Sequence, residues 1–394
     1  MPPVRPNRRS LIAGGLAVAA AAAVPLSVST PAAAADPIPL RLVGPTGPLP
    51  VGAVELHLID PSRTDPWSGQ AREVMVTVTY PAADVRDRTL LPWLPAGAER
   101  ALKARFGGAM DGYAIPKTHS ADRAPVLPGR RPVLLHSPGY QSDRTFNTLV
   151  IEELASWGYV VAAVDHPHDS GEVEFPDGRV VVTVPDGTSW EATAAIAVRA
   201  ADLRFVLDQL TVLERGGNPD VERRPLPRGL RGALDLTRVG AFGHSRGGAA
   251  SASVMYMDER VRAGIDLDGA LYGPVVEHGL DRPFLLMDNV VHDGLNQDPT
   301  WPPFWSHLSD WHRCLRLADA DHNDFTDLAA LAPQLPEPVR KMLQIGTVPA
   351  DRAVAAVRAT VRAFFDLQLR GRPDAGQLLW GASPRYPEIE YIAG

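Results

Sequence analysis

The sequence predicts an α/β fold, in which a mostly parallel central sheet carries helices on both faces. Three observations point to it. Short apolar runs alternate with helical patterns over most of the chain, as is typical of a parallel sheet with helical connections. Most of these runs are apolar throughout, as expected for strands buried on both faces. No Pro/Ser-rich linker divides the chain, so a single domain is expected.

The apolar pattern places the expected strands. The earliest is predicted at 73–80, where valines alternate with Met75, Thr77 and Thr79. Buried strands are then expected at 132–136, 159–164, 239–242, 263–267, 283–287 and 314–318.

Helices are expected between these strands and near the end of the chain. They are predicted at 99–106, 149–157, 190–213 and 353–369. A hairpin is predicted at 174–184 around a Pro-Asp-Gly turn. Residues 91–130, rich in Pro, Gly and Ala, form an excursion, and either this excursion or residues 171–190 could cover a pocket.

The first 35 residues are predicted to be a signal peptide. Arg8-Arg9, followed by Ser-Leu-Ile, resembles a twin-arginine signal, and 11–24 is an apolar stretch. Three alanines at 33–35 fit a cleavage site. An uncleaved membrane anchor is the alternative, but the apolar stretch is short and Pro25 interrupts it. The expected organisation is a signal peptide at 1–35 and one domain at 36–394 of an exported protein.

Composition argues against several classes of partner. The formal net charge is −7 and no basic patch is present, so no nucleic-acid partner is expected. No stretch after residue 36 is long and apolar enough to span a bilayer, so stable membrane insertion is not expected. The single cysteine, Cys314, rules out an intramolecular disulfide. The oligomeric state is left open.

Residues 243–247, Gly-His-Ser-Arg-Gly, form the most specific motif. They follow the expected strand at 239–242 and precede a small-residue helix start at 248–252. In this strand–turn–helix context, G-x-S-x-G is typical of a nucleophile elbow, which exposes its serine above the sheet. Ser245 is therefore the predicted nucleophile. The alternative is a glycine-rich turn with a capping serine.

A serine nucleophile needs a histidine to accept its proton and an acid to orient that histidine. In the α/β-hydrolase arrangement both follow the serine, in the order acid and then histidine. His322 fits best, because it comes just after an expected strand in a polar turn, and His292 is the alternative. Judged by position alone, Asp268 and Asp288 are nearly equal candidates for the acid, because each lies at the end of an expected strand. Position does not exclude Asp266 either.

Three segments are more informative together than singly. They are Gly-His-Ser-Arg-Gly-Gly at 243–248, Asp-Leu-Asp-Gly-Ala at 266–270 and Asp-His-Asn-Asp-Phe at 321–325. The combination resembles the platelet-activating factor acetylhydrolase group of α/β-hydrolases. The segments 132–140 and 154–166 match as well, and the resemblance covers roughly 54–365. It implies the α/β-hydrolase fold, with Asp268 as the acid.

The resemblance also implies how an oxyanion would be held. The family shows His-Gly-x-Gly where this chain has Pro138-Gly139-Tyr140-Gln141. The expected donors are the backbone N–H groups of Tyr140 and Arg246, since backbone donors tolerate a change of side chain. The Arg246 side chain could steer an anionic substrate or form a surface salt bridge. This mechanism needs no metal and no cofactor.

Two further clusters have a functional alternative. Asp-His-Pro-His-Asp at 165–169 has ligands that suit zinc, but its position after a strand favours buried hydrogen bonding that shapes the pocket. The aromatic residues at 301–305, with Trp311, could wall an acyl or aryl pocket or pack in the core.

The predicted function is that of a secreted serine carboxylic-ester hydrolase. Its expected substrates are small-molecule or lipid esters with short-chain or phospholipid-like acyl groups. The alternatives are a lipase or cutinase-like polyester hydrolase, a peptidase, and a non-catalytic binding protein that keeps the fold.

Overall fold

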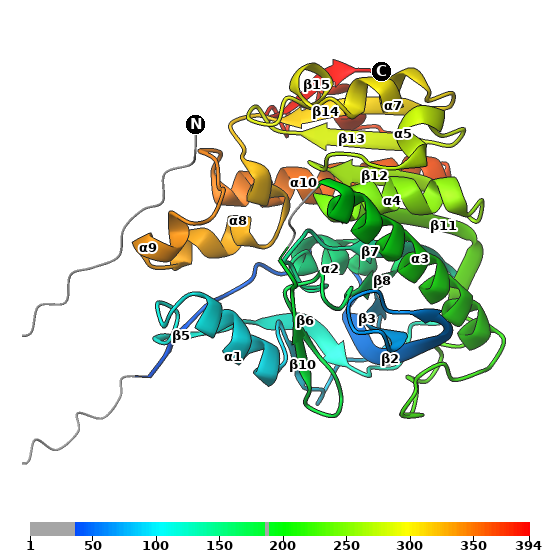
Figure 1. Ribbon diagram of the computed structural model, residues 1–394, viewed down its shortest axis with the longest axis vertical. Coiled ribbons are helices and arrows are strands. Elements are labelled where there is room, and N and C mark those ends of the chain that lie inside the picture. Colours follow the sequence, from blue (N-terminus) through cyan, green and yellow to red (C-terminus); the bar gives the residue numbers. More distant parts are fainter. Residues whose placement is uncertain (1–35, 186–188) are drawn as a thin grey trace, which may run out of the picture. The chain divides into compact units, whose positions relative to one another are not determined.

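The computed structural model describes residues 36–185 and 189–394. The predicted signal peptide and its twin-arginine motif lie outside the described residues, so they stay predictions. Residues Pro37–Gly394 form one compact unit, which is built around an 11-stranded sheet (Figure 1).

The middle of this sheet is parallel, as predicted. From one side to the other it consists of β8 (Val160–Val164), β7 (Arg131–Ser137), β11 (Leu234–His244), β12 (Val261–Leu267), β13 (Phe284–Asp288) and β14 (His312–Leu317). Each of these strands overlaps a predicted apolar run. Their central residues are buried on both faces, which explains the absence of alternation.

Strands of mixed direction extend the sheet at both edges. Beyond β8 lie β3 (Ala71–Pro81), β2 (Val51–Thr64), β6 (Lys117–Asp122) and β4 (Leu90–Pro92), and beyond β14 lies β15 (Ile389–Ala393). Of these strands, only β3 was expected from the sequence. The neighbouring pairs β8–β3, β3–β2, β6–β4 and β14–β15 are antiparallel.

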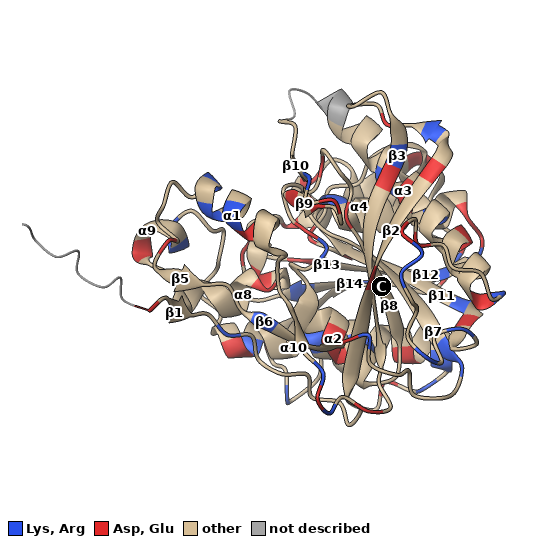
Figure 2. Ribbon diagram, turned by 90° about the horizontal axis from the view of Figure 1, so that it is seen from below, with Lys and Arg blue, Asp and Glu red and all other residues tan. Residues whose placement is uncertain are grey.

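Helices cover both faces of the sheet and bury two apolar cores. Helices α2 (Thr148–Ser156) and α10 (Ala350–Arg370) pack on one face, and α3 (Ser189–Glu214) and α4 (Arg246–Met257) pack on the other (Figures 1 and 2). The predicted α/β fold class is therefore confirmed. Figure 2 also shows acidic and basic residues intermixed along the helices and loops.

The remaining elements are short. They are β1 (Ile38–Pro39), α1 (Ala96–Arg105), β5 (Tyr113–Ala114), β9 (Glu172–Glu174), β10 (Val180–Val182), α5 (Pro274–His278), α6 (Gly294–Gln297), α7 (Trp301–Ser306), η1 (His322–Phe325), α8 (Leu328–Leu331), η2 (Ala332–Gln334), α9 (Glu337–Arg340) and η3 (Leu378–Trp380). Strands β9 and β10 are the two arms of the predicted hairpin. None of the helices in the described ranges has both the length and the apolar character needed to cross a membrane.

The order of the strands determines where a site can form. The chain runs from β7 to β8 on one side and then returns through α3 to β11 on the other side of β7. In the paired register, Gly243 of β11 lies opposite Ser137 of β7. The carboxyl ends of β7 and β11 therefore flank a topological switch point, where open α/β sheets bind their ligands.

Candidate active site

Ser245 occupies the sharp turn between β11 and α4. Its backbone angles are φ 54° and ψ −125°, and a positive φ is strained for a residue with a side chain. The Ser245 N–H donates to Leu267 O at 2.8 Å, which ties the turn to the end of β12. This is the strained strand-to-helix turn that the motif predicts.

The glycines around Ser245 are required by close backbone contacts. A Cβ at Gly247 would lie 2.0 Å from Ser137 O, and one at Gly243 would lie 2.3 Å from the backbone of Gly247. A Cβ at Gly248 would lie 1.7 Å from Oδ1 of Asp266. The start of α4 can therefore approach β7 and β12 only because these positions lack side chains.

Asp268 and His322 are joined by a short hydrogen bond. Asp268 follows β12 with a φ of 62°, and its Oδ2 lies 2.5 Å from Nδ1 of His322, at the start of η1. Because an ionised carboxylate only accepts hydrogen bonds, Nδ1 carries the proton and Nε2 is the basic nitrogen. Asp321 and Asp324 form a capping box that fixes the turn around His322.

A second histidine shares the Asp268 carboxylate. Nδ1 of His292 lies 3.0 Å from Oδ1 of Asp268, and its Nε2 lies 3.0 Å from Oδ2 of Asp298. Burial opposes a charge on His292, but hydrogen bonds to the two carboxylates outweigh it and raise its pKa to about 10. His292 is therefore protonated at neutral pH and is unsuited to be a general base.

Asp268 remains ionised despite its burial. Burial disfavours the charge, but hydrogen bonds from His292 and His322 outweigh this effect and lower its pKa. Asn289 adds a third donor, with Nδ2 at 2.7 Å from Oδ2 of Asp268.

The other two candidate acids have different partners. Asp288 accepts from Nε and Nη2 of Arg316, both at 3.0 Å. Asp266 accepts from the N–H of Gly269 at 3.0 Å, and burial raises its pKa well above the ordinary value. Of the three carboxylates, only Asp268 is hydrogen-bonded to His322 in the described contacts.

His244, which precedes the nucleophile, contacts both the backbone and the ring of His322. Its Nε2 donates to the backbone oxygen of His322 at 2.8 Å, and the two rings pack with centroids 4.4 Å apart. Burial lowers the pKa of His244 to about 3, so this ring is neutral and serves as a fixed donor.

Ser245 and His322 line the same cavity, which has a volume of about 490 Å³. Most of its apolar wall comes from two segments, 93–115 with α1 and 328–344 with α8 and α9, and residues 139–146 after β7 complete the side next to Ser245. The first segment belongs to the excursion expected to cover a pocket, whereas the second was not anticipated. No described residue of 171–190 belongs to the lining. A volume of this size is typical of small-molecule sites.

The two residues expected to supply oxyanion donors come from different segments next to the turn. Tyr140 follows β7 and lines the cavity, and Arg246 is the first residue of α4. The Arg246 side chain reaches Asp169 at 2.5 Å and stacks over the Tyr140 ring at 4.2 Å. The salt bridge between Arg246 and Asp169 is therefore largely buried and not a surface salt bridge, since only 11% of the Arg246 side chain is exposed.

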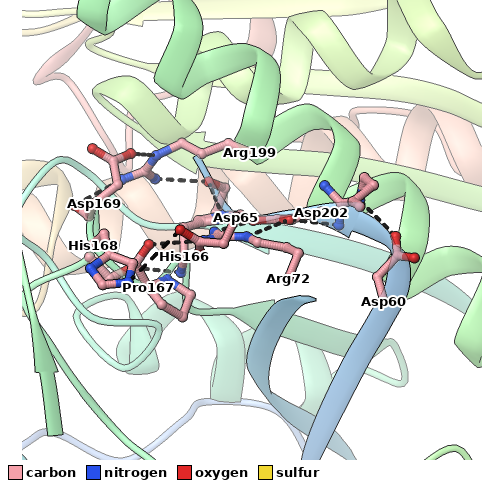
Figure 3. Close-up of polar contacts among 12 residues, drawn as sticks. Asp60, Asp65, Arg72, His166, Pro167, His168, Asp169, Arg199 and Asp202 are labelled. Carbon is pink, nitrogen blue, oxygen red and sulfur yellow. Dashed lines mark hydrogen bonds and ion pairs between the residues drawn. The ribbon is translucent and has the colours of Figure 1, made fainter. Parts of the chain in front are cut away.

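The cluster at 165–169 belongs to a buried polar network (Figure 3). His166 bonds Ser137 and Asp202, at 3.0 and 2.9 Å, and Asp169 pairs with Arg199 and Arg246. Within the described ranges, no group of His, Cys, Asp and Glu is arranged to hold a metal ion. The structure thus shows the expected hydrogen bonding here.

The hypothesis that the aromatic segment at 301–305 walls the pocket is wrong. None of its residues lines the cavity described above, nor does Trp311. Trp301 is fully buried, donates to Gly269 O at 2.7 Å and packs edge-on against His292. Phe304 packs against Phe284 of β13. The segment therefore supports the loop that carries His292 instead of contacting the cavity.

Comparison with known proteins identifies the family. The model for "Platelet-activating factor acetylhydrolase, isoform II" matches residues 194–372. A protein of Arthroderma benhamiae named "Probable 1-alkyl-2-acetylglycerophosphocholine esterase" is 29% identical over 93% of this chain and 97% of its own length. The platelet-activating factor acetylhydrolase of Cavia porcellus is 22% identical, covering 65% of this chain and 62% of the relative.

A solved structure extends the comparison. The ferulic acid esterase of Streptomyces cinnamoneus has a TM-score of 0.77 and 36% sequence identity, over 90% of this chain and 99% of that one. The chain belongs to the platelet-activating factor acetylhydrolase-like family of α/β-hydrolases. This acetylhydrolase-like protein is accordingly a serine carboxylic-ester hydrolase that acts on small-molecule esters.

The roles of several side chains around this acetylhydrolase-like site were not identified from the sequence, including that of His292, which the sequence offered only as an alternative base. Asn289 and His292 contact Asp268, and His244 holds the backbone of His322. The signal for Asn289 is its position directly after β13, at the same sheet edge as Asp268. Arg199 gives no such signal, because it lies within a helix far from every motif.

Proposed function

We propose that this protein hydrolyses carboxylic esters with Ser245 as nucleophile, His322 as general base and acid, and Asp268 as the acid that orients His322. The main support is the hydrogen bond between Asp268 and His322 beside the cavity that His322 and Ser245 both line. The strained turn at Ser245 provides independent support, since such a turn exposes a serine hydroxyl.

The proposed reaction runs in two halves. Oγ of Ser245 attacks the ester carbonyl carbon while Nε2 of His322 takes the hydroxyl proton. The tetrahedral intermediate collapses, the C–O bond to the alcohol breaks, and His322 returns the proton to the leaving alcohol. Water then attacks the acyl-enzyme, again with His322 as base, and releases the acid and free Ser245.

Charge stabilisation in this mechanism is also assigned to specific groups. Asp268 is ionised and stabilises the imidazolium that His322 forms in each half-reaction. We propose the backbone N–H groups of Tyr140 and Arg246 as the oxyanion donors. The second of these lies at the start of α4, where the helix dipole favours negative charge.

The apolar cavity supports a substrate with a sizeable apolar part. We propose a short-acyl ester in which the lipid-like alcohol occupies the space between α1 and α9. The Arthroderma benhamiae relative carries a name that describes a substrate of this kind, an alkyl-acetyl glycerophosphocholine. A p-nitrophenyl acetate would react without filling the cavity, whereas a lipid-like acetate would gain binding from it.

A second candidate substrate is an aromatic acyl ester. The structure with 36% identity is a ferulic acid esterase, and Trp93, Phe106 and Phe146 line the cavity here. Aromatic rings pack well against such side chains.

The test is hydrolysis of p-nitrophenyl esters from acetate to palmitate, of methyl ferulate, and of an alkyl-acetyl phospholipid, by residues 36–394. We expect turnover of the acetyl esters, and a Ser245→Ala variant should lose activity on the order of 10⁴-fold or more. Preference for methyl ferulate would select the aromatic substrate, and a long-chain optimum would indicate a lipase. Turnover that survives in Ser245→Ala would contradict the mechanism.

We also propose that the protein acts outside the cell after twin-arginine export. The support is the sequence of residues 1–35 alone, with its arginine pair, apolar stretch and alanine-rich cleavage site.

A further inference from the structure

A buried arginine, Arg199, lies behind the loop that carries one proposed oxyanion donor. It comes from α3 and its side chain is fully buried. Its guanidinium contacts the loop directly. Nη1 donates to Pro138 O at 2.5 Å, and Nη2 donates to Gly139 O at 3.2 Å. Nη1 also reaches Oγ of Ser137, at 3.2 Å.

These contacts determine the orientation of the peptide group between Gly139 and Tyr140. The carbonyl of Gly139 and the N–H of Tyr140 belong to one planar trans unit, so they point in opposite directions. Arg199 draws the carbonyl toward the buried side. The N–H of Tyr140 must then face away from Arg199, toward the cavity that Gly139 and Tyr140 line.

Gly139 benefits from an external anchor, because within the loop its carbonyl accepts only a long hydrogen bond in the described contacts, from the Ser142 N–H at 3.3 Å. Glycine populates backbone conformations that other residues avoid, so its flanking peptides rotate more easily. A side chain cannot restrict it, because a Cβ at Gly139 would lie 2.9 Å from Nδ1 of His244. A planar guanidinium with several fixed donors is suited to hold two successive carbonyls at once.

Asp169 connects this anchor to the second donor. Its carboxylate pairs with Nε of Arg199 and with Nη1 of Arg246, the latter at 2.5 Å. Burial opposes the charge of Asp169, but the two arginines outweigh it and lower its pKa. Figure 3 shows Asp169 and Arg199 facing each other in this network. One carboxylate therefore links Arg199, which holds the Gly139 carbonyl, to Arg246, which follows the nucleophile.

We propose that Arg199 is a positioning residue for oxyanion stabilisation, which acts by holding the Gly139 carbonyl so that the Tyr140 N–H faces the reacting carbonyl oxygen. This inference rests on the proposed function. Arg199 is not among the described residues that line the cavity, so its effect must pass through the loop backbone. It should therefore change transition-state stabilisation with little change in substrate binding.

The test compares Arg199→Lys with Arg72→Lys. Lysine keeps the positive charge, but its three donors share one nitrogen and cannot reproduce the planar fork with which Arg199 reaches two carbonyls and a carboxylate. Arg72 is a matched control, since it is also a buried arginine, pairs with Asp65 and Asp202, and bonds only the carbonyl of Pro167 among backbone oxygens in the described contacts. Both variants are assayed for kcat and KM on p-nitrophenyl acetate, and their melting temperatures are measured.

The decisive readout is inhibition by an alkyl trifluoromethyl ketone, to which Ser245 adds to give a hemiketal oxyanion. For Arg199→Lys we expect kcat to fall on the order of 10²–10³-fold, as when one donor is lost, with KM little changed. The affinity for the ketone should fall by the same factor as kcat/KM. For Arg72→Lys we expect kcat and ketone affinity to stay near wild type.

Three results would overturn the inference: unchanged kcat in Arg199→Lys, a loss of kcat without loss of ketone affinity, or an equal loss in Arg72→Lys. If Arg199→Lys does not fold, Asp169→Asn carries the test with the same readouts, because it removes the anionic partner of Arg199. An absence of wild-type ester turnover would instead refute the proposed function, so the two failures are distinguishable.

Discussion

At the scale of single residues, the choice of acid depends on hydrogen-bond partners rather than on position in the sequence. Asp268 and Asp288 both lie at strand ends, yet Asp268 bonds His322 whereas Asp288 bonds Arg316. Asp268→Asn should therefore lower kcat on the order of 10⁴-fold, because an amide cannot keep His322 in the required tautomer. The measurement is kcat on p-nitrophenyl acetate.

Asp288→Asn is the matched control. It removes a charge at the next strand end and weakens the pairing with Arg316, so we expect a lower melting temperature with kcat near wild type. A nearly normal Asp268→Asn enzyme beside an inactive Asp288→Asn enzyme would reverse the assignment.

His292 gives a pH dependence of stability. Its pKa is raised from the ordinary 6.5 to about 10, since hydrogen bonds to Asp268 and Asp298 outweigh burial. The folded state thus holds a proton that the unfolded state releases, and raising the pH between these values favours unfolding. Stabilisation by His292 should be complete below pH 6.5 and be lost as the pH rises through about 10.

The measurement is the melting temperature of wild type and His292→Gln from pH 6 to pH 10.5. We expect the wild type to be more stable at pH 6 and the difference to shrink as the pH rises. His278→Gln, on the exposed side of α5, controls for loss of a surface histidine. A difference that is constant over the whole range would contradict this account.

At the scale of elements, two segments form the apolar side of the cavity. One is α1 with the residues that follow it, and the other contains α9 and ends near Leu343. Leu343 is only partly buried, so a larger side chain there can extend into the cavity without displacing the core. Leu343→Trp should lower kcat/KM for lipid-like or long-chain esters several-fold relative to p-nitrophenyl acetate.

Val212→Trp is the control for this prediction. Val212 is 43% exposed on α3 and does not line the cavity, so its ratio of long-chain to acetate activity should match wild type. Equal selectivity in Leu343→Trp and wild type would show that the substrate does not occupy this part of the cavity.

The local sequence pattern predicted the strands that are buried on both faces. It missed the edge strands, which are recognisable only from the strands with which they pair. The parallel strands are buried on both faces, which produces recognisable apolar runs. Strand β2 contains Pro61 and ends in polar residues, so its place beside β3 becomes evident only from the register. Strand β15 has five residues, most of them exposed or half-exposed. It is a strand because it pairs with the edge of β14.

The site was predictable to a similar extent. Ser245 is marked by a local turn that requires small neighbours, and His322 by a polar turn after a strand. The contacts of Asp268, His292 and Arg199 join segments far apart in the chain. No local pattern encodes such contacts, and the second cavity wall was missed for the same reason.

At the scale of the whole molecule, the topology is compatible with the proposed export of a chain that has already folded. The sheet brings β2 and β15, near the two ends of the described chain, into one structure through the crossover at β7 and β11. Such non-local pairing is slow and leaves apolar strands exposed while it forms. The single cysteine is buried and free, so folding does not require an oxidising compartment. A pathway that carries folded proteins suits these properties.

The arginine pair at the N-terminus should therefore control localisation without affecting catalysis. Replacing Arg8 and Arg9 by lysine should leave folded, active esterase inside a bacterial host that has the twin-arginine pathway, because that pathway reads the pair itself rather than its charge. Arg5→Lys is the control and should be exported normally. The measurement is Ser245-dependent esterase activity in the medium and in the cell. Export of the lysine pair at the wild-type level would instead indicate the general secretory route, with folding after translocation.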